Sequence, residues 1–208
     1  MLLEIILTNA STKELPQVYP SFSKEFSHES KGMDYLEKLM EKKKYLLLLI
    51  KDQHTLKNIG YAFIFESTNS KFLWIDYVAI FPEYRNTGIG KVFIKKLFSE
   101  YSKNTLGIFF EIDKYFDTIE EKISIEKRVN FYKKFNAQKL NVDYLFESDG
   151  KFVEMDLYFI PMKETNLLEG TVLKDCLIEF FDYFYDEKTR STLDFPYNTT
   201  FEAQSLRS

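Results

Sequence analysis

Apolar and polar positions alternate along the chain in two patterns, one typical of strands and one typical of helices. Runs rich in β-branched and aromatic residues, bounded by polar turns, have the pattern of strands. They cover residues 2–8, 45–50, 59–66, 72–81, 106–112, 137–147 and 151–160. Apolar residues spaced three and four apart predict helices. These helices run from Ser11 or Thr12 toward Tyr19, over 33–43, from about Gly88 to Tyr101, from Thr118 to about Phe135, and over about 171–188.

The order of these elements is β-α-α-β-β-β-α-β-α-β-β-α, which predicts an α/β fold with helices covering a mixed sheet. The polar stretch KDQHTLKN, residues 51–58, separates two apolar runs and predicts a hairpin. Thr118 followed by Glu121 is a capping box, which predicts the start of a helix.

Composition indicates an ordinary globular protein: 45% of the 208 residues are hydrophobic and 17% are aromatic. The net charge is −4, so no positive field attracts nucleic acid or anionic lipid, and neither is an expected partner. No apolar run approaches the length that spans a membrane. The start, MLLEIILTN, lacks the cationic lead of a secretion signal. We therefore expect a cytoplasmic protein.

The residues that bind metals are few. Cys176 is the single cysteine, and His28 and His54 are the two histidines. Together they are too few for a disulfide or a zinc site, so we expect no metal.

Two of the seven glycines, Gly88 and Gly90, stand one residue apart in WIDYVAIFPEYRNTGIGKVF, residues 74–93. This stretch has the pattern of a strand, a loop and the start of a helix. The first N–H groups of that helix and the positive end of its dipole therefore point to one place, which suits phosphate. Arg85 adds a guanidinium that can bind phosphate oxygens through two N–H groups. The alternative is a plain turn with a surface arginine.

Spacing tests two phosphate-binding motifs. A Walker A loop needs a hydroxyl residue after its lysine, whereas Val92 follows Lys91. The dinucleotide fingerprint matches at its first two glycines, and Glu111 stands about where an acid would meet a ribose. However, Phe93 occupies the position of the third glycine. A NAD-type dinucleotide-binding protein is therefore a poorly supported alternative.

A third pattern fits better. RNTGIG, residues 85–90, preceded by VAIFPEY, resembles the acyl-CoA pyrophosphate loop of the GNAT family of N-acetyltransferases, whose pattern is Arg/Gln-x-x-Gly-x-Gly/Ala. RVNFYKKFNAQKL, residues 128–140, resembles a later helix of that family, with its recurring Phe-Tyr pair. The element order from Leu2 to Ile160 matches as well. In this helix Asn136 stands where the family usually has glycine, and asparagine tolerates left-handed backbone.

The resemblance implies the GNAT fold, a mostly antiparallel sheet of about seven strands in which strands 72–81 and 106–112 run parallel and splay apart. It implies acetyl-CoA as the cosubstrate, with strand backbone along the pantetheine arm and loop amides on the pyrophosphate. The residues implied to bind it are Val78, Ile80, Arg85, Asn86, Thr87, Gly88, Ile89, Gly90 and Lys91. The chemistry should then lie at the carboxyl ends of the two parallel strands.

Three side chains in that region are candidates for proton transfer. Asp76 is the only charge in an apolar strand, so burial should raise its pKa, which suits a base. Glu111 ends another apolar strand and is the second candidate base. The alternatives are a structural acid for Asp76 and a solvated strand-end acid for Glu111. The resemblance implies that Tyr132 protonates the departing CoA thiolate, whereas helical spacing alone makes it a core residue.

We therefore expect an enzyme, an acetyl-CoA-dependent N-acetyltransferase that moves an acetyl group to a primary amine by direct attack. The acceptor is either a small-molecule amine or a protein amino group, and the sequence leaves both open. The alternative from another class is a catalytically silent acyl-CoA-binding module or sensor.

The chain continues beyond the region of the resemblance. We expect residues 1–163 to form the GNAT domain and residues 164–208 to form a C-terminal helical extension. The helix at 171–188 has an apolar face that must be covered. We expect this face to pack on the same domain, with dimerisation as the alternative, so the protein is a monomer or a homodimer.

Overall fold

The computed structural model describes residues 4–27, 31–148, 151–163, 165 and 167–206 of the chain. Residues 2 and 3 of the first predicted strand and His28 lie outside these ranges. The chain divides into two compact units. The first unit consists of Met1–Glu66 and Trp74–Asn104, and the second consists of Ser67–Leu73 and Thr105–Ser208.

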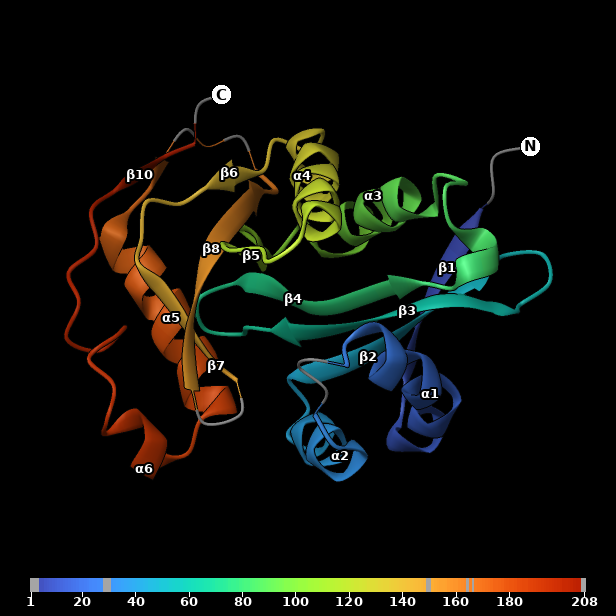
Figure 1. Ribbon diagram of the computed structural model, residues 1–208, viewed down its shortest axis with the longest axis horizontal. Coiled ribbons are helices and arrows are strands. Elements are labelled where there is room, and N and C mark those ends of the chain that lie inside the picture. Colours follow the sequence, from blue (N-terminus) through green and yellow to red (C-terminus); the bar gives the residue numbers. More distant parts are fainter. Residues whose placement is uncertain (1–3, 28–30, 149–150, 164, 166, 207–208) are drawn as a thin grey trace. The chain divides into compact units, whose positions relative to one another are not determined.

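The first unit contains the helices that the sequence predicts near the N-terminus and the helix after the glycine loop (Figure 1). Its elements are β1 (Ile5–Ala10), η1 (Thr12–Glu14), α1 (Leu15–Glu25), α2 (Met33–Glu41), β2 (Tyr45–Asp52), β3 (Asn58–Glu66), β4 (Phe72–Ile80), η2 (Pro82–Tyr84) and α3 (Ile89–Tyr101). The first two residues of β4 belong to the second unit. Ser11 caps η1 through a capping box with Glu14.

The strands of the first unit pair antiparallel. β1 pairs with β2 from Ile5 opposite Asp52 to Ala10 opposite Leu47, and β2 pairs with β3 as the predicted hairpin. At the end of β4, the Phe81 amide donates to the Ile59 carbonyl of β3 over 2.9 Å. Phe22 of α1 closes the core against this sheet. Burying one such ring stabilises a fold by about 2 kcal/mol.

The second unit contains the remaining elements. They are β5 (Gly107–Asp113), α4 (Ile119–Lys133), β6 (Gln138–Lys139), β7 (Tyr144–Ser148), β8 (Lys151–Pro161), β9 (Leu167–Leu168), α5 (Gly170–Phe184), α6 (Glu187–Arg190) and β10 (Gln204–Ser205). β8 is the central strand, because β5, β6 and β7 all pair antiparallel with it. β9 and β10 form a separate antiparallel pair.

β5 divides its side chains between two faces. Phe109 pairs with Phe159 of β8 and Phe110 pairs with Tyr158, and the ring centroids lie 4.7 and 5.4 Å apart. Successive residues of a strand point to opposite faces. Glu111 therefore shares the face of Phe109 and not the face of Phe110.

The register also places Tyr144 on the face of Glu111. Tyr144 of β7 pairs with Met155 of β8, and Met155 pairs with Asp113 of β5. Directly opposed residues point to the same face, and Asp113 is two residues from Glu111. The side chains of Tyr144 and Glu111 can therefore meet across β8.

The C-terminal helix α5 buries one face within the second unit. The buried residues of that face are Leu173, Cys176, Leu177, Phe180, Phe181 and Phe184. Glu179 accepts hydrogen bonds from the Ser67 hydroxyl and the Ser70 amide. Gly170 is the first residue of α5 and lies against the backbone of Phe201. A Cβ on Gly170 would lie 1.9 Å from the Phe201 carbonyl oxygen. Only glycine fits this position without a backbone shift.

Three predicted elements differ most from the structure. The helix predicted from Ser11 or Thr12 toward Tyr19 begins as η1 and continues as α1 to Glu25. The predicted strand 137–147 is two short strands, β6 and β7. The predicted helix over 171–188 stops at Phe184, because Tyr185 is extended (φ −109°, ψ 141°), and Asp186 then caps the separate helix α6. Among the described residues, no helix has the length and apolar character that crossing a membrane requires.

Candidate functional site

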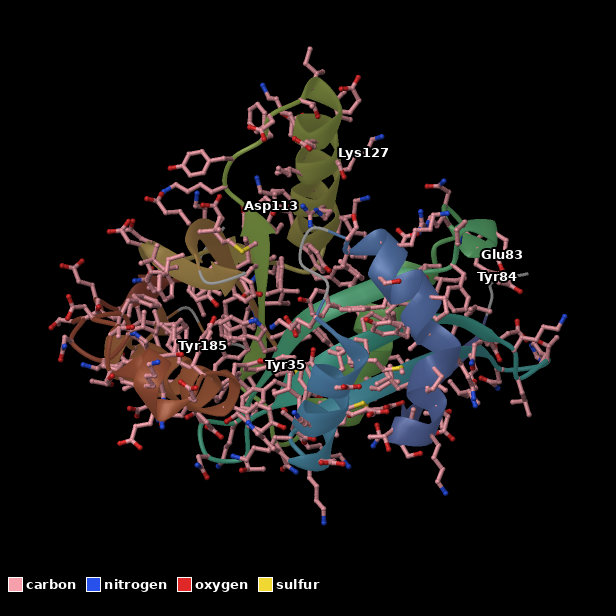
Figure 2. The ribbon with its side chains drawn as sticks, turned by 60° about the horizontal axis from the view of Figure 1, so that its bottom comes forward. Tyr35, Glu83, Tyr84, Asp113, Lys127 and Tyr185 are labelled. Carbon is pink, nitrogen blue, oxygen red and sulfur yellow. The ribbon has the colours of Figure 1, made fainter. Side chains whose placement is uncertain are left out.

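The glycine loop connects β4 with α3 in the first unit. It consists of residues 81–88 and includes η2, on which Figure 2 labels Glu83 and Tyr84. Two residues of the loop have left-handed backbone, Asn86 (φ 62°) and Gly88 (φ 88°). Asparagine and glycine are the residues that adopt this conformation most readily. Gly88 is the N-cap of α3, and a Cβ there would meet nothing within 4 Å, so φ and not crowding favours glycine.

The start of α3 is a potential anion site. The first N–H groups of an α-helix have no partner within the helix. The first turn of α3 contains no acidic residue, and Lys91 in that turn is exposed. The partial positive charge of the helix N-terminus is therefore not neutralised by the helix itself.

Side chains hold the loop in place. The Thr87 hydroxyl donates to the Tyr84 carbonyl over 2.6 Å, and the Arg85 Nε donates to the Ile80 carbonyl over 2.9 Å. The Arg85 guanidinium also forms an ion pair with Glu25 of α1, 2.6 Å away. In this arrangement Arg85 braces the loop, a role that the sequence did not indicate.

Val78 and Ile80 lie at the end of β4. Both are half-buried and alternate with the buried residues Tyr77 and Ala79. Ile80 also packs close to β3, since a Cβ on Gly60 would lie 3.0 Å from its Cδ1. Gly60 therefore permits β3 to lie tightly against this end of β4.

Asp76 is the candidate base of the first unit. Its carboxylate accepts a hydrogen bond from the hydroxyl of Tyr45, a side chain of β2 that is only 1% exposed. Burial raises the pKa of Asp76, while the charge of Lys31 and the Tyr45 hydrogen bond oppose that rise. The pKa of Tyr45 lies well above its usual range because the hydroxyl is buried and faces Asp76.

Aromatic rings lie next to the partners of Asp76, Lys31 and Tyr45. The Lys31 ammonium lies 5.4 Å from the ring centroid of Tyr35 on α2, a residue labelled in Figure 2. Phe63 of β3 stacks on Tyr45, with centroids 5.6 Å apart and an interplanar angle of 14°. The expectation that burial raises the pKa of Asp76 is confirmed.

Tyr132 is the candidate acid and lies on α4 in the second unit. It is 8% exposed and packs against Phe110, with ring centroids 4.1 Å apart and the ring planes tilted by 33°. Burial raises the pKa of Tyr132 to about 12, and the charge of Arg128 opposes this rise. The hydroxyl therefore keeps its proton at neutral pH. Asn136, which stands after this helix where the family usually has glycine, adopts left-handed backbone (φ 61°).

Glu111 is the candidate base of the second unit. Its Oε1 accepts a hydrogen bond of 2.6 Å from the hydroxyl of Tyr144, which is 1% exposed. The side chain is half-buried, so Glu111 is not the solvated strand-end acid that the sequence left as an alternative. Asp113, labelled in Figure 2, forms an ion pair with Arg128 of α4.

The structure thus places the loop residues and Asp76 in one unit and Tyr132 and Glu111 in the other. Each candidate base has a buried tyrosine donor, Tyr45 or Tyr144, that the sequence did not indicate. Each tyrosine opens an apolar run, and only strand register shows what its hydroxyl meets. In the part of the chain that the structure describes, no three His, Cys, Asp or Glu side chains form a metal-binding group.

Comparison with known proteins identifies the family. A model of the acetyltransferase (GNAT) family matches residues 13–119, just over half of the chain. The chain belongs to the acetyltransferase (GNAT) family. No curated protein matches the sequence closely enough to count as a relative.

Solved structures with the same fold cover most of the chain. A GNAT-family acetyltransferase from Bacteroides thetaiotaomicron has 19% identity and a TM-score of 0.60, over 75% of this chain and 86% of its own. Spermidine N-acetyltransferase from Vibrio cholerae, in complex with CoA and spermine, has 14% identity and a TM-score of 0.57, over 76% and 95%. Ribosomal-protein-S18-alanine N-acetyltransferase from Escherichia coli has 13% identity and a TM-score of 0.56, over 78% and 96%. The predicted fold class, a mixed sheet with flanking helices, is confirmed.

Proposed function

We propose that the protein is an N-acetyltransferase that moves an acetyl group from acetyl-CoA to a primary amine by direct attack. The glycine loop carries this proposal. In a GNAT-family chain, the left-handed residues Asn86 and Gly88 place the N-terminus of α3 at the end of β4. This is the arrangement of backbone N–H groups that suits a pyrophosphate.

The cosubstrate would be held mainly by backbone. The N–H groups of residues 85–90 would bind the pyrophosphate, with Lys91 adding positive charge nearby. Val78 and Ile80 would offer backbone groups to the pantetheine arm. Arg85 is engaged with Glu25 and the Ile80 carbonyl, which supports a bracing role more than a direct contact.

Tyr132 would protonate the thiolate that leaves. With its pKa raised to about 12, the hydroxyl is protonated at neutral pH and so has a proton to donate. The ring packs on Phe110, so its position does not depend on the hydroxyl. Loss of the hydroxyl should therefore affect chemistry without disturbing packing.

The base would be Glu111, or Asp76 acting through a water. The raised pKa of Asp76 suits a group that accepts a proton near neutral pH. Within the second unit, the Glu111 side chain leaves one face of β5, whereas Tyr132 packs on Phe110 at the opposite face.

A covalent acetyl-enzyme is not part of the proposal. Cys176, the single cysteine, is buried on α5, and burial raises the pKa of its thiol further from neutral. A buried thiol with a raised pKa is a poor nucleophile.

The acceptor would be a small-molecule amine or a protein amino group. By their names, two of the solved structures are enzymes that acetylate spermidine and an alanine of a ribosomal protein. The acidic charge of −4 gives weak support to a cationic acceptor. We further propose a cytoplasmic monomer or homodimer that binds neither nucleic acid nor membranes. We also propose that residues 1–163 form the acetyltransferase domain, with 164–208 as an extension packed on it.

The experiment is an amine panel read by CoA release. Polyamines, aminoglycosides, amino acids and peptides with free α- or ε-amino groups are incubated with acetyl-CoA and the full chain. Acetyl-CoA-dependent CoA release with one class of amine supports the proposal. Tight acetyl-CoA binding without release on any amine instead indicates a silent acyl-CoA-binding module or sensor. Binding of NAD in place of acetyl-CoA would favour the dinucleotide alternative.

A further inference from the structure

Glu111 accepts a hydrogen bond from Tyr144, and the Tyr144 ring packs against residues of the C-terminal part of the chain. The Tyr144 hydroxyl donates to Glu111 Oε1 over 2.6 Å. The Tyr144 ring meets Phe181 of α5 edge-on, with centroids 6.2 Å apart at 90°, and meets Phe195 edge-on at 5.7 Å and 85°. Figure 1 shows β7 running alongside α5. Both phenylalanines lie beyond residue 119, where the match to the GNAT family model ends.

The two phenylalanines are part of a continuous packing arrangement. The centroids of Phe181 and Phe195 lie 5.5 Å apart, and Phe195 meets Phe201 at 5.6 Å. The carbonyl of Phe201 lies directly against Gly170 at the start of α5. Phe181 and Phe195 are 1% and 8% exposed, so the rings leave little room for Tyr144 to move.

A second contact fixes the chain just before β7. The Gln204 side chain accepts a hydrogen bond of 2.7 Å from the amide of Asn141, three residues before Tyr144. Gln204 is 7% exposed and lies on β10, which pairs with β9. The C-terminal segment, which we define as residues 170–206, therefore contacts both the Tyr144 ring and the chain leading to it.

We propose that Tyr144 is a positioning residue for Glu111 and that the C-terminal segment holds Tyr144 in place. The proposal rests on the proposed function, in which Glu111 accepts the proton of the amine. A glutamate side chain has three rotatable bonds, and a base must lie within hydrogen-bond reach of the proton it takes. A donor on a rigid ring restricts those rotations through one carboxylate oxygen. The segment thus acts on the proton acceptor through Tyr144.

Charge supports the same assignment. A hydrogen bond donated to a carboxylate favours its ionised form, which is the form that acts as a base. Tyr144→Phe keeps the ring between Phe181 and Phe195 and removes only the donor. A purely structural hydroxyl would change stability alone, whereas a positioning hydroxyl also changes the pH–rate profile.

The test compares Tyr144→Phe, Glu111→Gln and the double variant with the full-length protein. For Tyr144→Phe we expect kcat to fall about 10-fold with KM for acetyl-CoA unchanged. The acidic limb of the profile should move to higher pH, because a carboxylate that loses a donor holds its proton more tightly. The double variant should be no slower than Glu111→Gln, because Tyr144 acts through Glu111.

Tyr197→Phe is the matched control. Its hydroxyl also donates to a carboxylate, Asp182, over 2.9 Å within the C-terminal segment. Tyr197→Phe should keep the wild-type profile. Phe195→Leu loosens the ring contact with Tyr144 and should move the acidic limb in the same direction as Tyr144→Phe, by a smaller amount.

Three results would overturn the inference: an unchanged profile in Tyr144→Phe, losses that simply add in the double variant, or a stability loss in Phe195→Leu without any change in profile. Absence of turnover on every amine would overturn the proposed function instead. In that case the carboxyl carbon of Glu111 is titrated by NMR. A midpoint that does not rise in Tyr144→Phe then overturns the positioning role as well.

Discussion

The two units of the chain offer different kinds of chemistry. In the first, the site candidates are backbone groups: the loop between β4 and α3, shaped by Asn86 and Gly88. In the second, they are the side chains of Tyr132 and Glu111, placed by packing on β5 and by Tyr144. A backbone site depends on a short contiguous segment, and a side-chain site depends on residues far apart in the chain. The two should therefore fail in different ways when mutated.

The two candidate bases continue this contrast. Asp76 pairs with Tyr45, and both residues lie within the segment that matches the family model. Glu111 lies within that segment too, but its partner Tyr144 and the rings around Tyr144 lie outside it. Asp76 is thus supported by a residue within the matched family segment, and Glu111 by residues that lie outside that segment.

The largest effect is expected at the backbone site. Gly90→Glu places a side chain and a negative charge in the first turn of α3, so acetyl-CoA binding should be abolished in a folded protein. Calorimetry measures the binding and circular dichroism the fold. Ser99→Glu adds the same single negative charge at an exposed position further along α3 and should retain binding. Unchanged affinity in Gly90→Glu would remove the loop from the site.

Tyr132→Phe tests the side-chain site. We expect kcat to fall roughly 10²–10⁴-fold, as for loss of a positioned proton donor, while acetyl-CoA affinity is retained. Steady-state kinetics and calorimetry separate the two quantities. Tyr158→Phe is the matched control, because Tyr158 is also buried and stacks on the same Phe110 ring at 5.4 Å. Nearly full kcat in Tyr132→Phe would make Tyr132 a core residue and water the proton donor.

The pH–rate profiles of two variants distinguish which of the two carboxylates, Glu111 or Asp76, is the base. Whichever of Glu111→Gln and Asp76→Asn removes the acidic limb identifies the base, because that limb reports protonation of the base as pH falls. Burial raises the pKa of Asp76, so a limb set by Asp76 should lie above the usual aspartate range. Asp156→Asn, which removes the ion pair between half-buried Asp156 and exposed Lys139, should leave the profile unchanged. If neither carboxylate variant alters the profile, the amine arrives already neutral.

Gly170→Ala should have the smallest effect on catalysis. Its main effect should be on the stability of the fold. A Cβ there would lie 1.9 Å from the Phe201 carbonyl oxygen, so Gly170→Ala must shift the backbone of the C-terminal segment. We expect the free energy of unfolding to fall by about 1–3 kcal/mol, measured by chemical denaturation. In Gly32→Ala a Cβ meets nothing within 4 Å, so only the weaker N-cap of α2 should lower its stability, by less than the change at Gly170. Equal stabilities would mean that the segment does not depend on this contact.

The amino-acid sequence by itself determined the features that are local along the chain. The loop before α3, its left-handed positions and the capping box of Thr118 with Glu121 are each formed by residues within a few positions of one another. Their geometry follows from backbone preference and nearby hydrogen bonds, so a contiguous pattern is enough to recognise them. The family resemblance rested on the same local pattern, and the family is confirmed. The division at residue 163 stays a prediction.

Only the tertiary structure decided which groups accompany the candidate bases. Tyr45 is 31 residues from Asp76 and Tyr144 is 33 residues from Glu111, and no local pattern links either pair. A shift of one residue in strand register would turn each tyrosine to the opposite face of its sheet. The predicted helix over 171–188 is divided at Tyr185, whose extended backbone separates α5 from α6. These contacts follow from strand register and packing, which bring distant residues together and which periodicity along the chain does not encode.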